Sequence, residues 1–139
     1  MEGVVVTSAI SVEDRCIDAF NELKCNRHIT TVLYRLNDSL DTLILDYEGN
    51  LTHDELLKSL PSDPRLVAYE LCFADRDGSR RAAIVLISWS PQGISSERMA
   101  AHAAVYVALR NQLGGIDLFV EAMRQSDLEY NRLVRAARA

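Results

Sequence analysis

Apolar positions alternate with polar ones in two different periods along the chain, and each period predicts one kind of element. Between Val12 and Leu23 apolar residues recur every three or four positions, which is typical of a helix with one buried face. Ser11, with an acid three residues later, predicts where this helix begins. Residues 31–36 and 42–47 are rich in strand-forming residues and are separated by turn residues, so they predict two adjacent strands.

The middle of the chain predicts a short helix and then a long hairpin. Thr52, with Glu55 three residues later, forms a capping box, and two prolines end the helix that it opens. Residues 65–74 alternate as a strand, and the Asp-Arg-Asp-Gly stretch at 75–78 is a hairpin turn signal. The return strand, 82–89, is apolar on both sides, which indicates a central strand covered on both faces.

The last third predicts a helix, a strand and a helix. An alanine-rich helix follows the Pro-Gly break after Trp89 and ends at two glycines. A short strand at 116–120 follows, and Ser126 with Glu129 predicts the start of the last helix. The helix between the fourth and fifth strands makes them parallel if they are neighbours. We therefore expect one α/β (α+β) domain over residues 1–139, with a mixed five-stranded sheet and helices on both faces.

Composition excludes several classes of function. The chain has 139 residues, of which 48% are hydrophobic, and this is enough for a single core. Its formal net charge of −5 argues against general nucleic-acid binding. No apolar stretch approaches the roughly 20 residues that span a bilayer, and the start of the chain has no signal-peptide pattern. The three cysteines are odd in number and not at metal-ligand spacing, which favours the cytoplasm.

Residues at catalytic or metal-ligating spacing are not recognisable. His28, His53 and His102 fall in three different elements, without an acid or a cysteine at ligand spacing. No glycine-rich phosphate loop follows a strand, and there is no G-x-S-x-G motif. Cys16 lies on the apolar side of its helix, which indicates a buried, unreactive thiol. The pattern predicts a binding protein without cofactor or metal, and a small-ligand enzyme on an α/β sheet is the weakest alternative.

Four stretches of the chain match segments of one known family, in the same order and at similar spacing along the chain. They are SAISVEDRCIDAFNELK, SLPSDPRLVAYELCF, GSRRAAIVLISWSP and ERMAAHAAVYVALRNQLGGI. Together they resemble the ADF/cofilin family, and the resemblance covers the chain from Ser8 to Arg138. It implies the actin-depolymerising factor homology fold, preceded by a flexible N-terminal extension at residues 1–7. It also implies a monomeric, cytoplasmic protein of the cytoskeleton that binds actin monomers and filaments and promotes filament severing and depolymerisation.

The resemblance implies one surface for actin monomers, on the long helix and the segment before the first helix. Its residues are Ser8, Ala9, Ile10, Arg98, Met99, His102 and Tyr106. Ser8 is also the implied phosphorylation site. Arg98, His102, Tyr106 and Arg110 are spaced four residues apart, so we expect them to form one outward stripe on the helix. Tyr106 stands where the family has a lysine, which implies that phosphoinositides bind weakly.

A second implied surface binds filaments and consists of arginines on the hairpin and the last helix, namely Arg80, Arg81, Arg132, Arg135 and Arg138. Arginine pairs well with carboxylates, which suits an acidic partner surface.

An alternative within the same fold is a glia-maturation-factor-like protein, which binds the actin-related branch-nucleating complex and removes branches. The stretches LPSDPRLVAYE and DGSRRAAIVLISWSPQG resemble that subgroup too, and a missing lysine on the long helix suits it. The FNELK opening and the two arginines of the hairpin favour the cofilin type.

Overall fold

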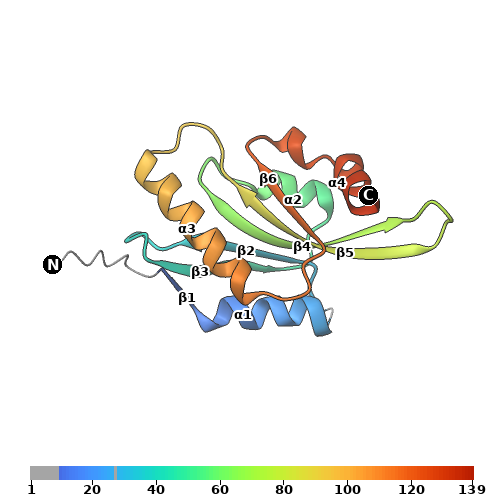
Figure 1. Cartoon of the computed structure of the whole chain (residues 1–139), viewed down its shortest axis with the longest axis horizontal. Helices are drawn as coiled ribbons and strands as arrows, with labels where there is room; N and C mark the ends of the chain where they lie inside the picture. Colours follow the sequence, from blue (N-terminus) through green and yellow to red (C-terminus); the bar gives the residue numbers. More distant parts are fainter. Residues whose placement is uncertain (1–9, 27) are drawn as a thin grey trace.

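The computed structural model of the chain describes residues 10–26 and 28–139 (Figure 1). The expected N-terminal extension, Ser8 and Ala9 lie outside the described residues. In chain order the elements are β1 (Ser11–Val12), α1 (Asp14–Asn21), the π-helical turn η1 (Glu22–Asn26), β2 (Thr31–Leu36), β3 (Thr42–Gly49), α2 (His53–Ser59), β4 (Arg65–Ala74), β5 (Arg80–Trp89), α3 (Ser96–Gln112), β6 (Leu118–Ala122), the 3-10 turn η2 (Gln125–Leu128) and α4 (Tyr130–Arg138).

The strands of the described residues form one mixed sheet in the order β1-β3-β2-β4-β5-β6. The outer pairs, β1 with β3 and β5 with β6, are parallel, and the inner pairs are antiparallel. The parallel β5–β6 pair, which the α3 crossover predicts, is confirmed. The sheet has six strands, so the prediction of five was wrong.

The additional strand is β1, at residues expected to open the first helix. The Ser11 amide donates to the Asp41 carbonyl at 2.9 Å, and the Glu13 amide donates to the Leu43 carbonyl at 3.1 Å. These bonds hold the backbone in an extended conformation, so α1 begins at Asp14 and Ser11 does not cap it. Similarly, η2 occupies the expected start of the last helix, which delays α4 until Tyr130.

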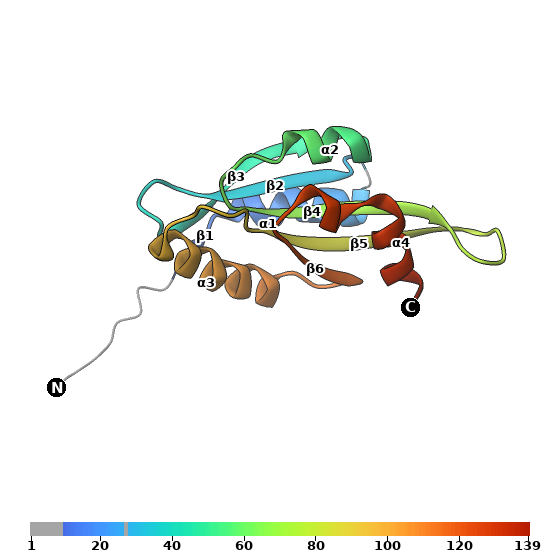
Figure 2. The ribbon, with the colours of Figure 1, turned by 90° about the horizontal axis from the view of Figure 1, so that it is seen from above.

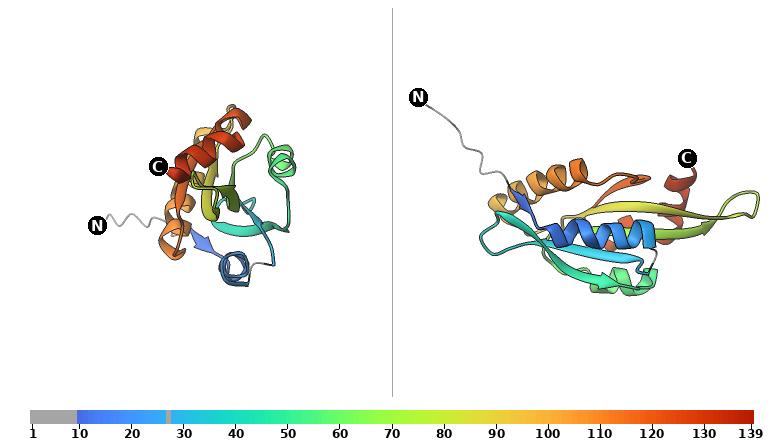
Figure 3. Two further views of the ribbon diagram at one scale, coloured as in Figure 1. Left: turned by 90° about the vertical axis from the view of Figure 1, so that its right-hand side faces the viewer. Right: turned by 90° about the horizontal axis from the view of Figure 1, so that it is seen from below.

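Helices cover both faces of the sheet, as predicted (Figures 2 and 3). α1 and α3 pack on one face, over a core that includes Phe20, Leu86 and Leu109. α2 and α4 pack on the other face, over a core that includes Ile87 and Leu133. Because neighbouring residues of β5 point to opposite faces, Leu86 enters one core and Ile87 the other. This explains why the sequence of this strand is apolar at every position from Ala82 to Ile87.

The β4–β5 hairpin is the longest in the sheet and extends beyond the body of the molecule (Figures 1 and 2). Its register runs without interruption from the Arg65–Trp89 pair to the Ala74–Arg80 pair. The turn closes where the Asp75 amide donates to the Ser79 carbonyl at 2.8 Å. Gly78 has φ of 86°, a conformation that glycine adopts at little cost, so the predicted turn is confirmed.

Candidate functional site

Two of the predicted site residues on α3 point inward. His102, Val105, Tyr106 and Leu109 are the buried residues of this helix, with 4% of His102 and 9% of Tyr106 exposed. The prediction that His102 and Tyr106 form an outward stripe with Arg98 was therefore wrong. A spacing of four residues places side chains on one face of a helix, but it does not say which face meets the sheet.

His102 connects α3 to the sheet through one buried hydrogen bond. Its Nε2 lies 2.9 Å from the hydroxyl of Ser88 on β5, and Ser88 is also buried. Burial lowers the pKa of His102 to about 4, so its ring is neutral at physiological pH. This histidine therefore stabilises the packing of the helix and does not meet a partner.

The outward face of α3 is apolar and built from small residues. Ala100, Ala103, Ala104 and Val107 recur at helical spacing and are exposed, with 51% of Val107 accessible. This face carries no charged residue between Arg98 and Arg110. Small side chains let a partner approach the helix closely, and an exposed apolar patch of this kind is typical of an interaction site.

One aromatic residue extends this apolar face onto the sheet edge. Phe119 on β6 is 47% exposed and pairs in register with Leu86, which places it on the α3 side of the sheet. The Arg110 guanidinium lies 5.1 Å from the centroid of the Phe119 ring and 5.6 Å from that of Tyr106. Sequence analysis did not find Phe119, because its place beside the helix depends on the β5–β6 pairing.

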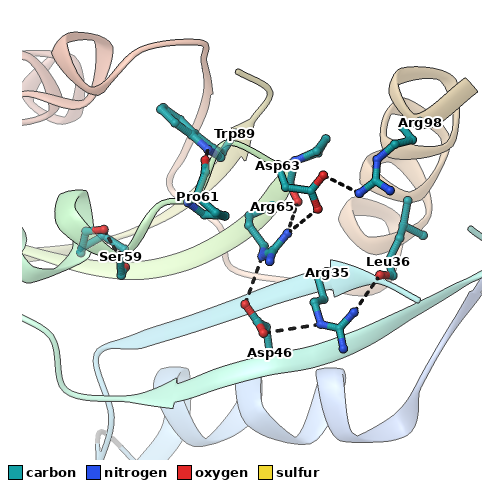
Figure 4. Close-up of polar contacts among 11 residues, drawn as sticks. Arg35, Leu36, Asp46, Ser59, Pro61, Asp63, Arg65, Trp89 and Arg98 are labelled. Atoms are coloured by element: carbon teal, nitrogen blue, oxygen red, sulfur yellow. Dashed lines mark hydrogen bonds and ion pairs between the residues drawn. The ribbon is translucent and has the colours of Figure 1, made fainter. Parts of the chain in front are cut away.

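Arg98 in the first turn of α3 belongs to a chain of ion pairs that crosses to the sheet (Figure 4). Its guanidinium binds Asp63, whose other oxygen accepts from Arg65 at 3.0 Å. Arg65 also binds Asp46 at 3.0 Å, and Asp46 in turn lies 3.5 Å from Arg35. The predicted site residue Arg98 is therefore held by other side chains of the same protein.

The remaining predicted residues of the monomer surface lie close to α3. Ile10 is partly buried and packs against the core under α1 and α3, and β1, which follows it, contacts α3. Met99 is also partly buried, in the first turn of the helix. The structure thus places the strand that follows Ile10 beside α3.

The two arginines of the hairpin point to opposite faces of the sheet. Arg81 pairs in register with Phe73, which faces α4, and its guanidinium lies 5.6 Å from the centroid of the Phe73 ring. Arg81 also binds Asp75 at 3.2 Å. Arg80 pairs with Ala74 and therefore points to the other face. Of these two, only Arg81 lies on the same face as the arginines of α4.

α4 is attached to the end of β4 that leads into the hairpin turn, and a basic groove of about 650 Å³ lies between α4 and the hairpin. Tyr130 donates its hydroxyl proton to the Cys72 carbonyl at 2.6 Å. The groove is lined by Phe73, Ala74, Arg76, Tyr130, Asn131, Val134, Arg135 and Arg138. Its three arginines come from two segments far apart in sequence.

The groove includes two of the filament-surface residues that the sequence predicts, Arg135 and Arg138. Arg135 lines it, whereas Arg132 lies outside and pairs with Asp127 at 3.7 Å. Arg138 also donates to the Ala74 carbonyl, and Arg76 lines the groove although it was not predicted. Arginines at every third position of the last helix were a signal for Arg138, but no local signal pointed to Arg76.

The described part of the chain contains no recognisable metal-binding group. No three histidine, cysteine, aspartate or glutamate side chains within residues 10–26 and 28–139 are grouped to hold an ion. In the same residues, no helix has the length and apolar character needed to cross a membrane. The Cys16 thiol is fully buried, and burial raises its pKa to about 12, so the prediction of a buried, unreactive thiol is confirmed.

Comparison with known proteins gives one consistent result. The model of the family described as cofilin/tropomyosin-type actin-binding protein matches residues 9–138. Cofilin of Yarrowia lipolytica is 28% identical over 130 residues, which cover 91% of this chain and 85% of the relative. The crystal structure of Streptomyces griseoflavus cofilin superposes with a TM-score of 0.84 at 21% identity, covering 91% of this chain and 96% of the other. Actin depolymerization factor 2 of Plasmodium berghei also has a TM-score of 0.84, at 19% identity, covering 96% and 100%.

Proposed function

Because the chain belongs to the family of cofilin/tropomyosin-type actin-binding proteins, we propose that it binds actin monomers and filaments and promotes filament severing and depolymerisation. The observation that carries this proposal is the outward face of α3, which is apolar, built from small residues and bounded by Arg98 and Arg110. The protein acts by binding, as a monomer in the cytoplasm, and no catalytic step or cofactor is part of the proposal.

The monomer surface combines the outward face of α3 with the segment that leads into β1. Ala103, Ala104 and Val107 replace the buried His102 and Tyr106 as the centre of this surface. Arg98 and Met99 at the start of the helix lie at one end of this surface, and Ile10 directly precedes β1, which contacts α3. On the resemblance alone we assign Ser8 and Ala9, the two residues before Ile10, to the same surface. A phosphate on Ser8 would add negative charge to the segment before β1 and weaken the binding of an acidic partner.

The filament surface combines the projecting hairpin with α4. Arg81 lies on the α4 side of the hairpin, and Arg135 lines the groove next to it. Arg80 extends the basic surface to the other face of the hairpin, and Arg132 extends it along α4. Because these residues lie on elements other than α3, one protein can contact two adjacent subunits. Binding that is stronger in one filament twist than in another would shift the filament toward that twist and weaken it.

Phosphoinositides are expected to bind weakly. The outward face of α3 offers no cation between Arg98 and Arg110, so an anionic membrane surface finds few charges there.

The proposal is tested by sedimentation of the purified chain with actin filaments, together with fluorescence imaging of filament length. We expect the chain to sediment with filaments and to shorten them. The actin-related branch-nucleating complex is tested in parallel by pull-down. Capture of that complex without filament binding or shortening would reject the proposal in favour of the glia-maturation-factor-like alternative.

A further inference from the structure

We propose that Asp63 is a positioning residue for actin binding, because it holds the Arg98 guanidinium in one orientation at the start of α3. This inference rests on the proposed function, in which Arg98 contacts the actin monomer. Asp63 lies in the loop between α2 and β4, 35 positions before Arg98 in the sequence.

Both carboxylate oxygens of Asp63 are occupied by arginines (Figure 4). One oxygen accepts from Nη2 of Arg98, and the other accepts from Nη1 of Arg65 at 3.0 Å. A carboxylate that is held from two sides has little freedom to rotate. The orientation of Asp63 therefore depends on how firmly Arg65 is itself fixed.

Arg65 is a fixed support, because it is bound at several points. Only 14% of its side chain is exposed. In addition to Asp63, it donates to the Pro64 carbonyl at 2.8 Å and to Asp46 on β3 at 3.0 Å. The loop that carries Asp63 is anchored as well, since Trp89 donates its indole N–H to the Pro61 carbonyl at 2.8 Å (Figure 4).

Arg98 is the member of this network that gains most from being held. Its side chain is 42% exposed, so without Asp63 it would sample many rotamers that binding would have to restrict. The bond to Asp63 engages one of the three guanidinium nitrogens of Arg98, Nη2. The N–H groups of the other two nitrogens can donate to a partner. A side chain ordered before binding loses less entropy on association.

The negative charge of Asp63 acts in the opposite direction, since it reduces the attraction of Arg98 for an acidic partner. Arg65 already compensates this charge. The complete network contains three arginines and two aspartates, namely Arg35, Asp46, Arg65, Asp63 and Arg98, and so keeps a net positive charge. We therefore expect the ordering of Arg98 to outweigh the loss of charge.

The test is a double-mutant cycle on the affinity for actin monomers, with the wild type, Asp63→Ala, Arg98→Ala and the double variant. Asp63→Ala should weaken binding about threefold to tenfold, and it should have no further effect once Arg98 is absent. Asp63→Asn keeps an oxygen acceptor and should retain more affinity than Asp63→Ala. Asp46→Ala is the matched control, because it removes a carboxylate that does not contact Arg98. Arg65 keeps its bonds to Asp63 and to the Pro64 carbonyl in this variant, so the affinity should change less than about twofold.

A second measurement reports the ordering directly in the free protein. In a nitrogen–proton NMR spectrum of the side chains, the Nε–H signal of Arg98 should be separate from those of the other arginines in the wild type and in Asp46→Ala. In Asp63→Ala it should move to the averaged position that solvent-exposed arginines share. An averaged Arg98 signal in the wild type would overturn the inference.

Three results of the affinity measurements would also contradict the inference. Equal or tighter binding by Asp63→Ala would show that Asp63 competes with actin for Arg98. An equal loss with and without Arg98 would show that Asp63 acts independently of it. No effect of Arg98→Ala, in a protein that still binds actin, would reject the inference and leave actin binding intact, whereas no binding by the wild type would reject the proposed function itself.

Discussion

His102 should make the stability of the protein sensitive to mild acid. The folded chain holds its ring neutral, because burial lowers the pKa from the ordinary value of 6.5 to about 4. Between these two values the unfolded chain binds a proton that the folded chain does not. The contribution of His102 to stability is therefore complete above pH 6.5 and is lost as the pH falls toward 4.

The size of this effect follows from the two pKa values. Each pH unit between them corresponds to about 1.4 kcal/mol, so the full shift corresponds to about 3 kcal/mol. Only 4% of His102 is exposed, so solvent screening reduces this figure little. At about pH 5 the part already lost should be about 2 kcal/mol, which is a large share of the 5–15 kcal/mol that is typical of a domain.

The assay is urea unfolding of the wild type and His102→Gln at about pH 7 and about pH 5. Glutamine does not titrate, and its amide can still bond to the Ser88 hydroxyl. Asp41, Asp75, Asp77 and Asp127, whose pKa values are lowered by hydrogen bonds, also lose stabilisation in acid, but they do so equally in both proteins. We expect the wild type to lose about 2 kcal/mol more than the variant between the two pH values. Equal losses would refute the conclusion that His102 is held neutral in the core.

Three further predictions concern other elements. Arg81→Glu combined with Arg135→Glu should weaken co-sedimentation with filaments and leave the affinity for monomers nearly unchanged, since neither residue lies on α3; equal loss of both activities would contradict two separate surfaces. Tyr106→Lys should lower the thermal midpoint without increasing binding to phosphoinositide vesicles, because only 9% of Tyr106 is exposed and the variant buries a charge. Thr52→Ala should lower the free energy of unfolding by about 1 kcal/mol in urea titrations, because it removes the hydroxyl that accepts from the Glu55 amide; an unchanged value would show that the cap contributes nothing.

The sequence predicted those parts of the fold whose signals are local. The capping box at Thr52 has both of its hydrogen bonds, and β4 has the predicted bounds. The turn at Gly78 also forms where the sequence placed it. β1 was not predicted, because a two-residue edge strand has no periodicity and exists only through its pairing with Thr42 and Leu43.

The candidate surfaces were only partly predictable, because they depend on orientation and on distant contacts. The alanine-rich α3 has weak contrast between its faces, so the sequence did not show that His102 and Tyr106 meet the sheet. The opposite orientations of Arg80 and Arg81 follow from the hairpin register. The contact between Asp63 and Arg98 joins an α2–β4 loop to α3, and no local pattern announces it.

The central claim is that the outward face of α3 binds actin, and the affinity of Val107→Glu for actin monomers tests it most directly. Val107 lies on the exposed side of the helix, so the variant should fold with nearly unchanged stability. Lys58→Gln on α2 is the matched control, because it makes the same change in net charge on an exposed residue at the opposite face of the sheet. We predict that Val107→Glu weakens monomer binding at least about tenfold, because the interface would bury an unpaired carboxylate, and that Lys58→Gln binds like the wild type. Equal affinities of Val107→Glu and the wild type would contradict the claim that this face meets actin.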